Sequence, residues 1–145
     1  MLALGICGAV MQSCDDDDDN LNVPEELRSA FSQKYPGSVP EWKTRSNYYI
    51  ADFRDQSYEA EAWFTSDAIW LMTETDIPYA ALPEAVKNAL QNSEYATWNR
   101  DDADMLERKG LEPVYVLEVE QGSREMDLYY NAEGILIKAM EDYEN

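Results

Sequence analysis

A pattern that occurs twice limits the folds open to this chain more than any other sequence feature. Residues 23–31 and residues 82–90 both read as an apolar residue, proline, glutamate and then apolar residues at helical spacing. Proline in the first turn of a helix loses no hydrogen bond, and glutamate there favours the positive end of the helix dipole. The pattern therefore predicts two short amphipathic helices, over residues 24–34 and 83–91, the first ended by a Tyr-Pro-Gly sequence.

Alternating runs of β-branched and aromatic residues follow each predicted helix. They occupy residues 49–53, 59–65 and 67–71 after the first helix, and residues 115–119, 125–131 and 133–137 after the second. Such runs between polar turns predict antiparallel strands, and we expect a shorter strand around Trp42 or Trp98 before each set. The predicted fold is α+β, a tandem duplication of a helix followed by an antiparallel meander of about four strands. Its repeats are residues 22–80 and 81–145, and the second carries an extra charged loop over residues 99–112.

Comparing the two copies predicts which face of the sheet is buried. The face expected under the helices carries apolar residues in both copies: Tyr49, Ala51, Phe53, Ala60, Ala62, Phe64, Ile69 and Leu71 in the first, and Tyr115, Leu117, Val119, Met126, Leu128, Tyr130, Ile135 and Ile137 in the second. The opposite face carries charged residues, namely Asp52, Arg54, Glu59, Glu61, Glu118, Glu125 and Asp127. An antiparallel sheet can leave one face in water, so we expect the helices on one face and the other face open.

The amino-terminal segment differs in composition from the rest of the chain. Leu2 to Val10 is an uncharged apolar stretch. It is too short for a membrane span, which takes about 20 residues, but it is typical of a secretory signal. It is followed by Met-Gln-Ser and Cys14, which resemble a bacterial lipobox. We predict a lipoprotein signal over residues 1–13 with lipid attached to Cys14, and a natural start upstream, because the first basic residue is Arg28. The alternative is a buried helix that carries a cysteine by chance.

Five aspartates, residues 15–19, follow this cysteine directly. Like charges repel and do not pack, so the simplest interpretation is a solvated acidic tether over residues 14–21. Acidic residues here also resemble the surface-export signal of some Gram-negative lipoproteins and, in other Gram-negative bacteria, an inner-membrane retention signal. We predict an outer-membrane lipoprotein, on the cell surface or facing the periplasm, held to the membrane by its lipid alone. Calcium binding is a third interpretation, although the run lacks the glycine and the distal glutamate of an EF-hand loop.

Composition excludes several classes of chemistry. The chain of 145 residues contains no histidine, which removes Ser-His-Asp and Cys-His hydrolysis, histidine-ligated zinc and histidine proton relays. Its net charge of -19 argues against nucleic acid as a partner, because phosphate contacts need a basic surface. A hydrophobic content of 45% with 12% aromatic residues is typical of a globular domain. We expect no cofactor and no metal.

The order of these features resembles a known family, the PepSY-like, β-lactamase-inhibitor-like secreted proteins, over residues 22–143. The resemblance rests on Pro24-Glu25, Ala30-Phe31, Tyr35-Pro36-Gly37, Trp42, a strand pair, a turn before Ile69-Trp70, and Leu82-Pro83. It implies a tandem α+β fold similar to β-lactamase inhibitory protein, with helices behind a sheet whose concave face is open, in exported bacterial proteins without assigned catalysis. The chain departs from the family at one turn, where the glycine is kept as Gly134 but replaced by Ala68 in the first copy. We expect that turn to be reshaped.

Strand alternation also places large apolar side chains on the open face: Tyr48, Trp63, Trp70, Met72, Tyr129 and Met140. Tyrosine and tryptophan often anchor binding surfaces, so these residues form the predicted partner-binding face. We predict a non-catalytic binding or inhibitory module that docks a protein, and the surrounding acids favour a partner with a basic segment. The alternative for these rings is structural: they cover one another or lie under the loop over residues 99–112.

Two other functions remain open from the sequence. The first is a lipoprotein that binds a small molecule, a glycan or calcium, and it predicts stabilisation by the ligand. The second is a hydrolase with paired carboxylates, for which Glu59 with Glu61, or Glu125 with Asp127, are the candidates because each pair shares a strand face. Alternation on any exposed strand gives the same pattern, and nothing in the sequence indicates the desolvated carboxyl that acid-base catalysis needs. We therefore expect no enzyme activity.

Overall fold

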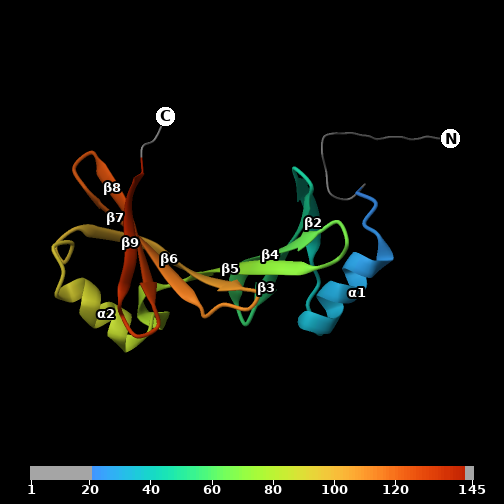
Figure 1. The fold of residues 1–145 in the computed structure, drawn as a ribbon, viewed down its shortest axis with the longest axis horizontal. Coiled ribbons are helices and arrows are strands. Elements are labelled where there is room, and N and C mark those ends of the chain that lie inside the picture. The colour runs from blue at the N-terminus through green and yellow to red at the C-terminus, as the bar shows by residue number, and fades with distance from the viewer. Residues whose placement is uncertain (1–20, 143–145) are drawn as a thin grey trace.

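The chain folds around one antiparallel sheet of eight strands. The structure is a computed structural model and describes residues 21–142. The elements are α1 (Glu25–Lys34), β2 (Glu41–Arg45), β3 (Tyr48–Asp55), β4 (Tyr58–Thr65), β5 (Trp70–Ile77), the 3-10 turn η3 (Tyr79–Ala81), α2 (Glu84–Gln91), β6 (Asn99–Arg108), β7 (Val114–Gln121), β8 (Arg124–Asn131) and β9 (Leu136–Asp142). The strands follow chain order from β2 at one edge to β9 at the other, and α1 and α2 lie at opposite ends of the molecule (Figure 1). The predicted signal segment and Cys14 lie outside the described residues.

The prediction of two consecutive four-stranded units is wrong. β5 pairs with β6 from Met72 opposite Arg108 to Ile77 opposite Ala103, so the sheet continues across the predicted boundary between the repeats. One eight-stranded meander with two short helices replaces the tandem duplication of helix and meander. Two separate sheets would each leave an edge of unpaired backbone groups at this boundary. Pairing β5 with β6 removes both edges.

Both helices pack on the same face of the sheet, and each builds its own apolar cluster. α1 buries Leu27 and Phe31 against β2, β3 and β4, with the Phe31 ring edge-on to Phe53 at 4.9 Å. α2 buries Val86 and Leu90 against β6, β7 and β8. The pairing register from β4 to β7 shows that the two clusters lie on the same face of the sheet. Neither helix in this part of the chain is long and apolar enough to cross a bilayer.

The predicted faces fail where the strands are irregular. Ile69, Ile135 and Ile137, which the alternation assigns to the core, are 44%, 61% and 54% exposed. The pairing register shifts once between β4 and β5 and once between β8 and β9. A bulge adds an unpaired residue to one strand and so reverses the alternation beyond it. Residues at or beyond each bulge therefore do not lie on the face that regular alternation predicts for them.

The turns that precede β5 and β9 share one hydrogen-bond pattern. The side-chain oxygens of Thr65 and Asn131 each accept two backbone N–H groups within their own turn. The backbone N–H of each of these residues donates to the carbonyl four residues later, at 2.9 and 3.0 Å. Ala68 has a φ of 67° and Gly134 a φ of 85°. The expected reshaping of the first turn is therefore not found, and Ala68 adopts the left-handed conformation that glycine reaches more easily.

Candidate binding face

The sheet face away from α1 and α2, here called the open face, carries an apolar cluster at its β2–β5 end. The rings of Tyr48 and Trp63 lie 6.0 Å apart, and Met72 opposes Trp63 on the next strand. Ile50 opposes Trp63 on β3 and is fully buried, although it faces away from the helices. The Arg45 guanidinium lies 5.7 Å from the Trp63 ring, within cation–π range. We call Tyr48, Ile50, Trp63 and Met72 the Trp63 cluster.

A second apolar cluster lies on the open face over β6, β7 and β8. Val116 opposes Tyr129 across β7 and β8, and Leu106 lines the same hollow as both. The Lys138 ammonium lies 4.6 Å from the Tyr129 ring. We call Leu106, Val116 and Tyr129 the Tyr129 cluster. Met140, opposite Asp127 on the edge strand β9, is 49% exposed and extends the apolar surface toward that edge.

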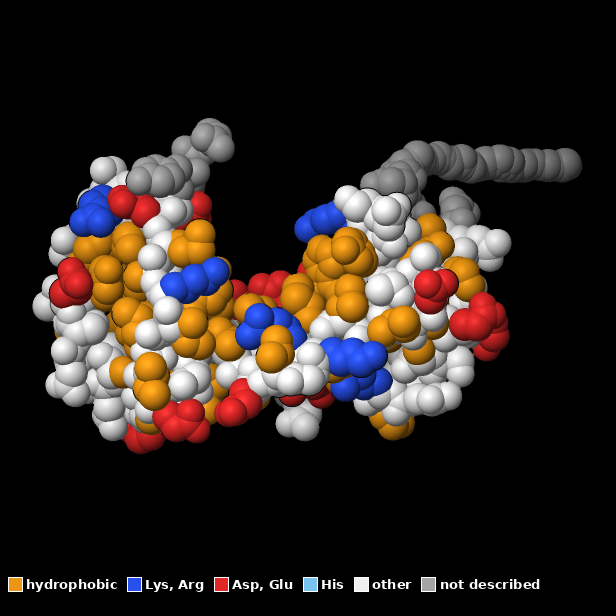
Figure 2. Space-filling model, viewed as in Figure 1, with side chains coloured by type: hydrophobic (Ala, Val, Ile, Leu, Met, Phe, Trp, Pro, Cys, Tyr) orange, Lys and Arg blue, Asp and Glu red, His pale blue; other side chains and the backbone are white. Residues whose placement is uncertain are grey.

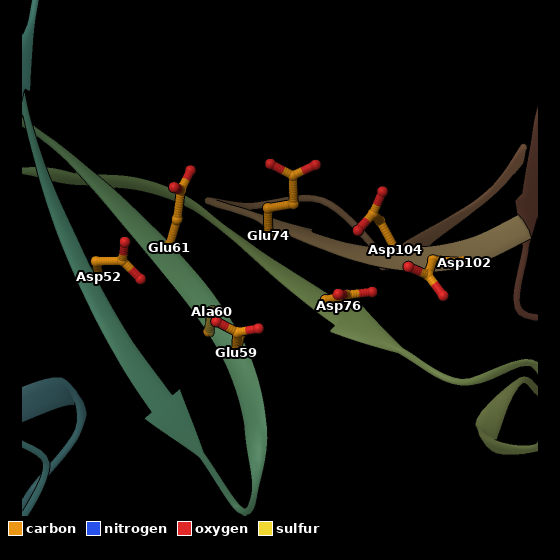
Figure 3. Close-up of a pocket in the computed structure, with 8 residues that line it drawn as sticks. All are labelled: Asp52, Glu59, Ala60, Glu61, Glu74, Asp76, Asp102 and Asp104. Carbon is orange, nitrogen blue, oxygen red and sulfur yellow. The ribbon is translucent and has the colours of Figure 1, made fainter.

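Between the two clusters the open face is hollow and acidic. Two adjoining hollows of about 400 and 300 Å³ share Glu74, Asp102 and Asp104 in their walls. Their acidic lining, here called the acidic band, consists of Asp52, Glu59, Glu61, Glu74, Asp76, Asp101, Asp102, Asp104, Glu118 and Asp127. Figure 2 shows the surface hollowed between the two ends of the molecule. Figure 3 shows the carboxylates of Glu61, Glu74 and Asp104 pointing to the same side of the strands.

Several carboxylates of the acidic band lie directly opposite one another on neighbouring strands. Glu61 opposes Asp52 on β3 and Glu74 on β5. Asp76 opposes Asp104 across β5 and β6. Like charges in directly opposed positions destabilise a sheet. The open face therefore carries an electrostatic cost that the fold itself does not require.

Burial and mutual repulsion raise carboxyl pKa values within the acidic band. Burial, followed by nearby negative charges with Glu74 first, raises the pKa of Asp104 to about 7. Burial, followed by the charges of Glu125 and its neighbours, raises the pKa of Glu118 to about 7. The pKa values of Glu74, Asp76 and Asp127 are also raised, mainly by burial. Near neutral pH the band thus retains protons that ordinary carboxyls have released.

Comparisons with known proteins agree with this architecture. The family model described as "Putative beta-lactamase-inhibitor-like, PepSY-like" matches residues 47–138. The chain belongs to this family. The family predicted from the sequence is thereby confirmed. No curated protein matches the chain.

Solved structures show where this PepSY-like protein stands among its relatives. A BLIP-like protein from Bacteroides fragilis is 34% identical, with 90% of this chain and 94% of that chain covered and a TM-score of 0.83. A DUF2874 family protein from Bacteroides ovatus is 28% identical, with 84% and 89% covered and a TM-score of 0.79. A protein described as one of the "putative periplasmic proteins", from Bacteroides eggerthii, is 23% identical, with 83% and 90% covered and a TM-score of 0.77, and supports the fold alone.

One residue predicted for the binding face of this PepSY-like protein lies on the other face. Tyr48, Trp63, Met72, Tyr129 and Met140 are on the open face, in the places described above. Trp70 instead opposes Phe64 on the helix face. Its Nε1 donates to Thr73 Oγ1 at 2.9 Å, and Lys34 Nζ lies 3.7 Å from its ring. The bulge between β4 and β5 is the reason, because Leu71 is an extra residue between Trp70 and Met72 and so reverses the alternation there.

The open face predicted from the sequence lacks all three acids that line both hollows, Glu74, Asp102 and Asp104. From the sequence, the last two are expected in a charged loop over residues 99–112, whereas β6 crosses the middle of the sheet between β5 and β7. The sequence did contain a signal for a strand here, because Ala103 and Met105 alternate with Asp102 and Asp104. Ala103 and Met105 belong to the α2 cluster, while the acids face the open side. A loop of that length without structure of its own is also uncommon in a compact domain.

The described residues contain one group of carboxylates close enough to suggest a metal ion. Single oxygens of Glu118, Glu125 and Asp142 lie within 4.8 Å of one another in this part of the chain. Calcium takes six to eight oxygen ligands, and exposed acids gather on many protein surfaces without an ion. Three carboxylates at the edge of the sheet therefore do not by themselves make a calcium site.

The paired carboxylates considered for hydrolysis occupy ordinary positions on their strands. Glu59 and Glu61 face the open side of β4, and Glu125 and Asp127 face the open side of β8. Asp104, whose carboxyl pKa is raised to about 7, belongs to neither pair. It lines a hollow that is open to solvent, whereas active sites commonly enclose the reacting groups and admit only the water that reacts. The arrangement fits binding better than acid-base catalysis.

Proposed function

We propose that this PepSY-like protein is a non-catalytic module that docks a protein partner on the open face of its sheet. The observation that carries the proposal is a hollowed face that no other part of residues 21–142 covers, with an aromatic side chain in an apolar cluster on each side, Trp63 and Tyr129. Aromatic side chains are frequent anchors of protein interfaces. Eight strands about 4.8 Å apart give a face roughly 30 Å wide, which suits an interface of standard size.

The relatives support a protein-binding function for this chain, but they do not identify its partner. One relative, 34% identical, is a BLIP-like protein, and the family description refers to β-lactamase inhibitors. Shared fold does not transfer a target, because function depends on the site that each chain carries. The proposal is therefore protein docking through one sheet face, and it names no target protein.

We propose in addition that the module is exported and held at the outer membrane by lipid on Cys14. The support is the apolar stretch from Leu2 to Val10 followed by a lipobox-like sequence that ends at Cys14. Residues 14–20 then act as a solvated spacer between the lipid and the domain, whose described part begins at Leu21, packed against the α1 cluster. Labelling with palmitate tests the anchor, and Cys14→Ser removes the label if the proposal is correct.

The docking proposal is tested by capture from an envelope extract with the full chain and two variants. Trp63→Ala/Tyr129→Ala removes one ring from each cluster. Val39→Ser/Ile135→Ser removes two apolar side chains that belong to neither cluster and are 87% and 61% exposed in the loops before β2 and β9. Circular dichroism and thermal unfolding verify that both variants are folded. We expect one protein to be enriched by the native chain and by the loop variant, and reduced about tenfold or more with the ring variant. Equal capture by all three baits would contradict docking through this face.

A further inference from the structure

The acidic band carries more negative charge than the chain neutralises. Among the described residues, the ion pairs that reach the band come from Lys43, whose Nζ lies 2.7 Å from Glu61 and 3.7 Å from Asp52. Arg54, on the same face, donates to the backbone carbonyl of Ser57 at 3.0 Å. Further along the band, carboxylates oppose carboxylates across neighbouring strands. Natural proteins tolerate such local conflicts mainly at functional sites.

The two apolar clusters point independently to the chemistry of a ligand. Arg45 lies 5.7 Å from the Trp63 ring, and Lys138 lies 4.6 Å from the Tyr129 ring. Each ring thus already has a cationic side chain of the chain itself within cation–π range, which shows that both rings lie where a cationic group is attracted. A segment that combines cationic with apolar side chains matches both the clusters and the band between them.

We propose that the partner docks with a cationic polypeptide segment, whose lysine or arginine side chains enter the acidic band and whose flanking apolar side chains contact the Trp63 and Tyr129 clusters. This inference rests on the proposed function and names the kind of segment that the open face takes. The band repels the phosphates of a nucleic acid and the headgroups of an anionic membrane. A second copy of the chain, with a net charge of -19, is repelled in the same way.

The test uses a fluorescein-labelled lysine-rich peptide with leucine near both ends, and the same peptide with glutamine in place of every lysine. Fluorescence anisotropy measures binding to the full chain at low and at physiological ionic strength. The band variant, Glu74→Gln/Asp76→Asn/Asp104→Asn, removes opposed carboxylates and leaves the ion pairs of Lys43 intact. The control variant removes the same charge from exposed positions outside the band: Glu94→Gln, Glu112→Gln and Glu133→Gln.

We expect the native chain and the control variant to bind the lysine peptide with similar affinity. Binding should weaken about tenfold or more in the band variant, and it should weaken as ionic strength rises. The glutamine peptide should bind more weakly than the lysine peptide. If the band and control variants lose affinity for the lysine peptide equally, net charge alone determines binding and the proposal is overturned. Equal binding of the lysine and glutamine peptides would also overturn it.

The captured partner separates this inference from the proposed function on which it rests. If the band variant retains the partner while Trp63→Ala/Tyr129→Ala loses it, the cationic segment is overturned and docking on the open face stands. If both variants lose the partner while the Glu94, Glu112 and Glu133 control retains it, both proposals are supported. Capture that neither variant changes would overturn both.

Discussion

Replacing Gly134 by alanine is expected to lower the free energy of unfolding by about 3 kcal/mol. Gly134 has a φ of 85°, and a Cβ there would overlap the carbonyl oxygen of Ala85 and lie 2.9 Å from its carbonyl carbon. The left-handed conformation costs an L-residue about 1–2 kcal/mol, and overpacking adds about 1–3 kcal/mol. The obstructing atoms are backbone atoms of α2, which cannot turn aside as a side chain would. Urea unfolding followed by circular dichroism measures the difference.

Two matched changes separate the backbone effect at Gly134 from the clash. Gly122 has a φ of 64° with open space around it, so Gly122→Ala is expected to cost only about 1–2 kcal/mol. Ala68 adopts a φ of 67° in the equivalent turn before β5, so Ala68→Gly should be neutral or stabilise by up to about 1 kcal/mol. If Gly134→Ala costs no more than Gly122→Ala, the turn does not press against α2 as described.

The free energy of unfolding is expected to rise as the pH falls from about 8 to about 5. The pKa values of Asp104 and Glu118 are about 7 in the folded chain, above ordinary values of 3.8 and 4.5. Between those limits the folded state binds more protons than the unfolded state, so acidification favours folding. This stabilisation of the folded state is complete only below the ordinary pKa values of 3.8 and 4.5, and it is lost as the pH rises through about 7.

Asp104→Asn tests the origin of this pH dependence. The variant cannot ionise at that position, so it should be more stable than the native chain at pH 8 by about 1–2 kcal/mol, after allowance for solvent screening. At pH 5 the difference should shrink to about a third of its pH 8 value, because the unfolded carboxyl still ionises there, and this flattens the profile. Glu133→Gln, an exposed change outside the band, should leave the profile unchanged. A native chain that loses stability between pH 8 and pH 5 would contradict the description of the band.

The helices and most strand faces could be predicted because their signals are local. The Pro-Glu starts mark α1 and α2, which begin at Glu25 and Glu84. Uninterrupted alternation correctly assigns β3, β4, β7 and β8, with Phe64 and Leu128 among the fully buried residues. Alternation predicts which face of the sheet a side chain occupies only within a regular strand. The bulges at Leu71 and Ile137 therefore could not be located, because a bulge depends on the partner strand as well as on its own sequence.

The site was harder to predict because it depends on long-range pairing. The acidic band forms only where β5 meets β6 and brings Asp76 opposite Asp104. β6 has no apolar residues other than Ala103, Met105 and Leu106, so its composition resembles that of a loop. Its strand conformation is imposed by its neighbours on both sides, an effect of tertiary context that local propensity does not carry. The prediction of two separate units failed for the same reason.

Hydroxyl-radical footprinting of the full chain, alone and with its captured partner, tests the central claim most directly. The method reads solvent access at tryptophan, tyrosine and methionine side chains, and these residue types occur on both faces of the sheet. Docking on the open face predicts that the partner protects Trp63, Met72 and Tyr129 and leaves the half-buried Trp70 and Trp98 of the helix face unchanged. Protection of Trp70 and Trp98 with Trp63 and Tyr129 still reactive would contradict the account.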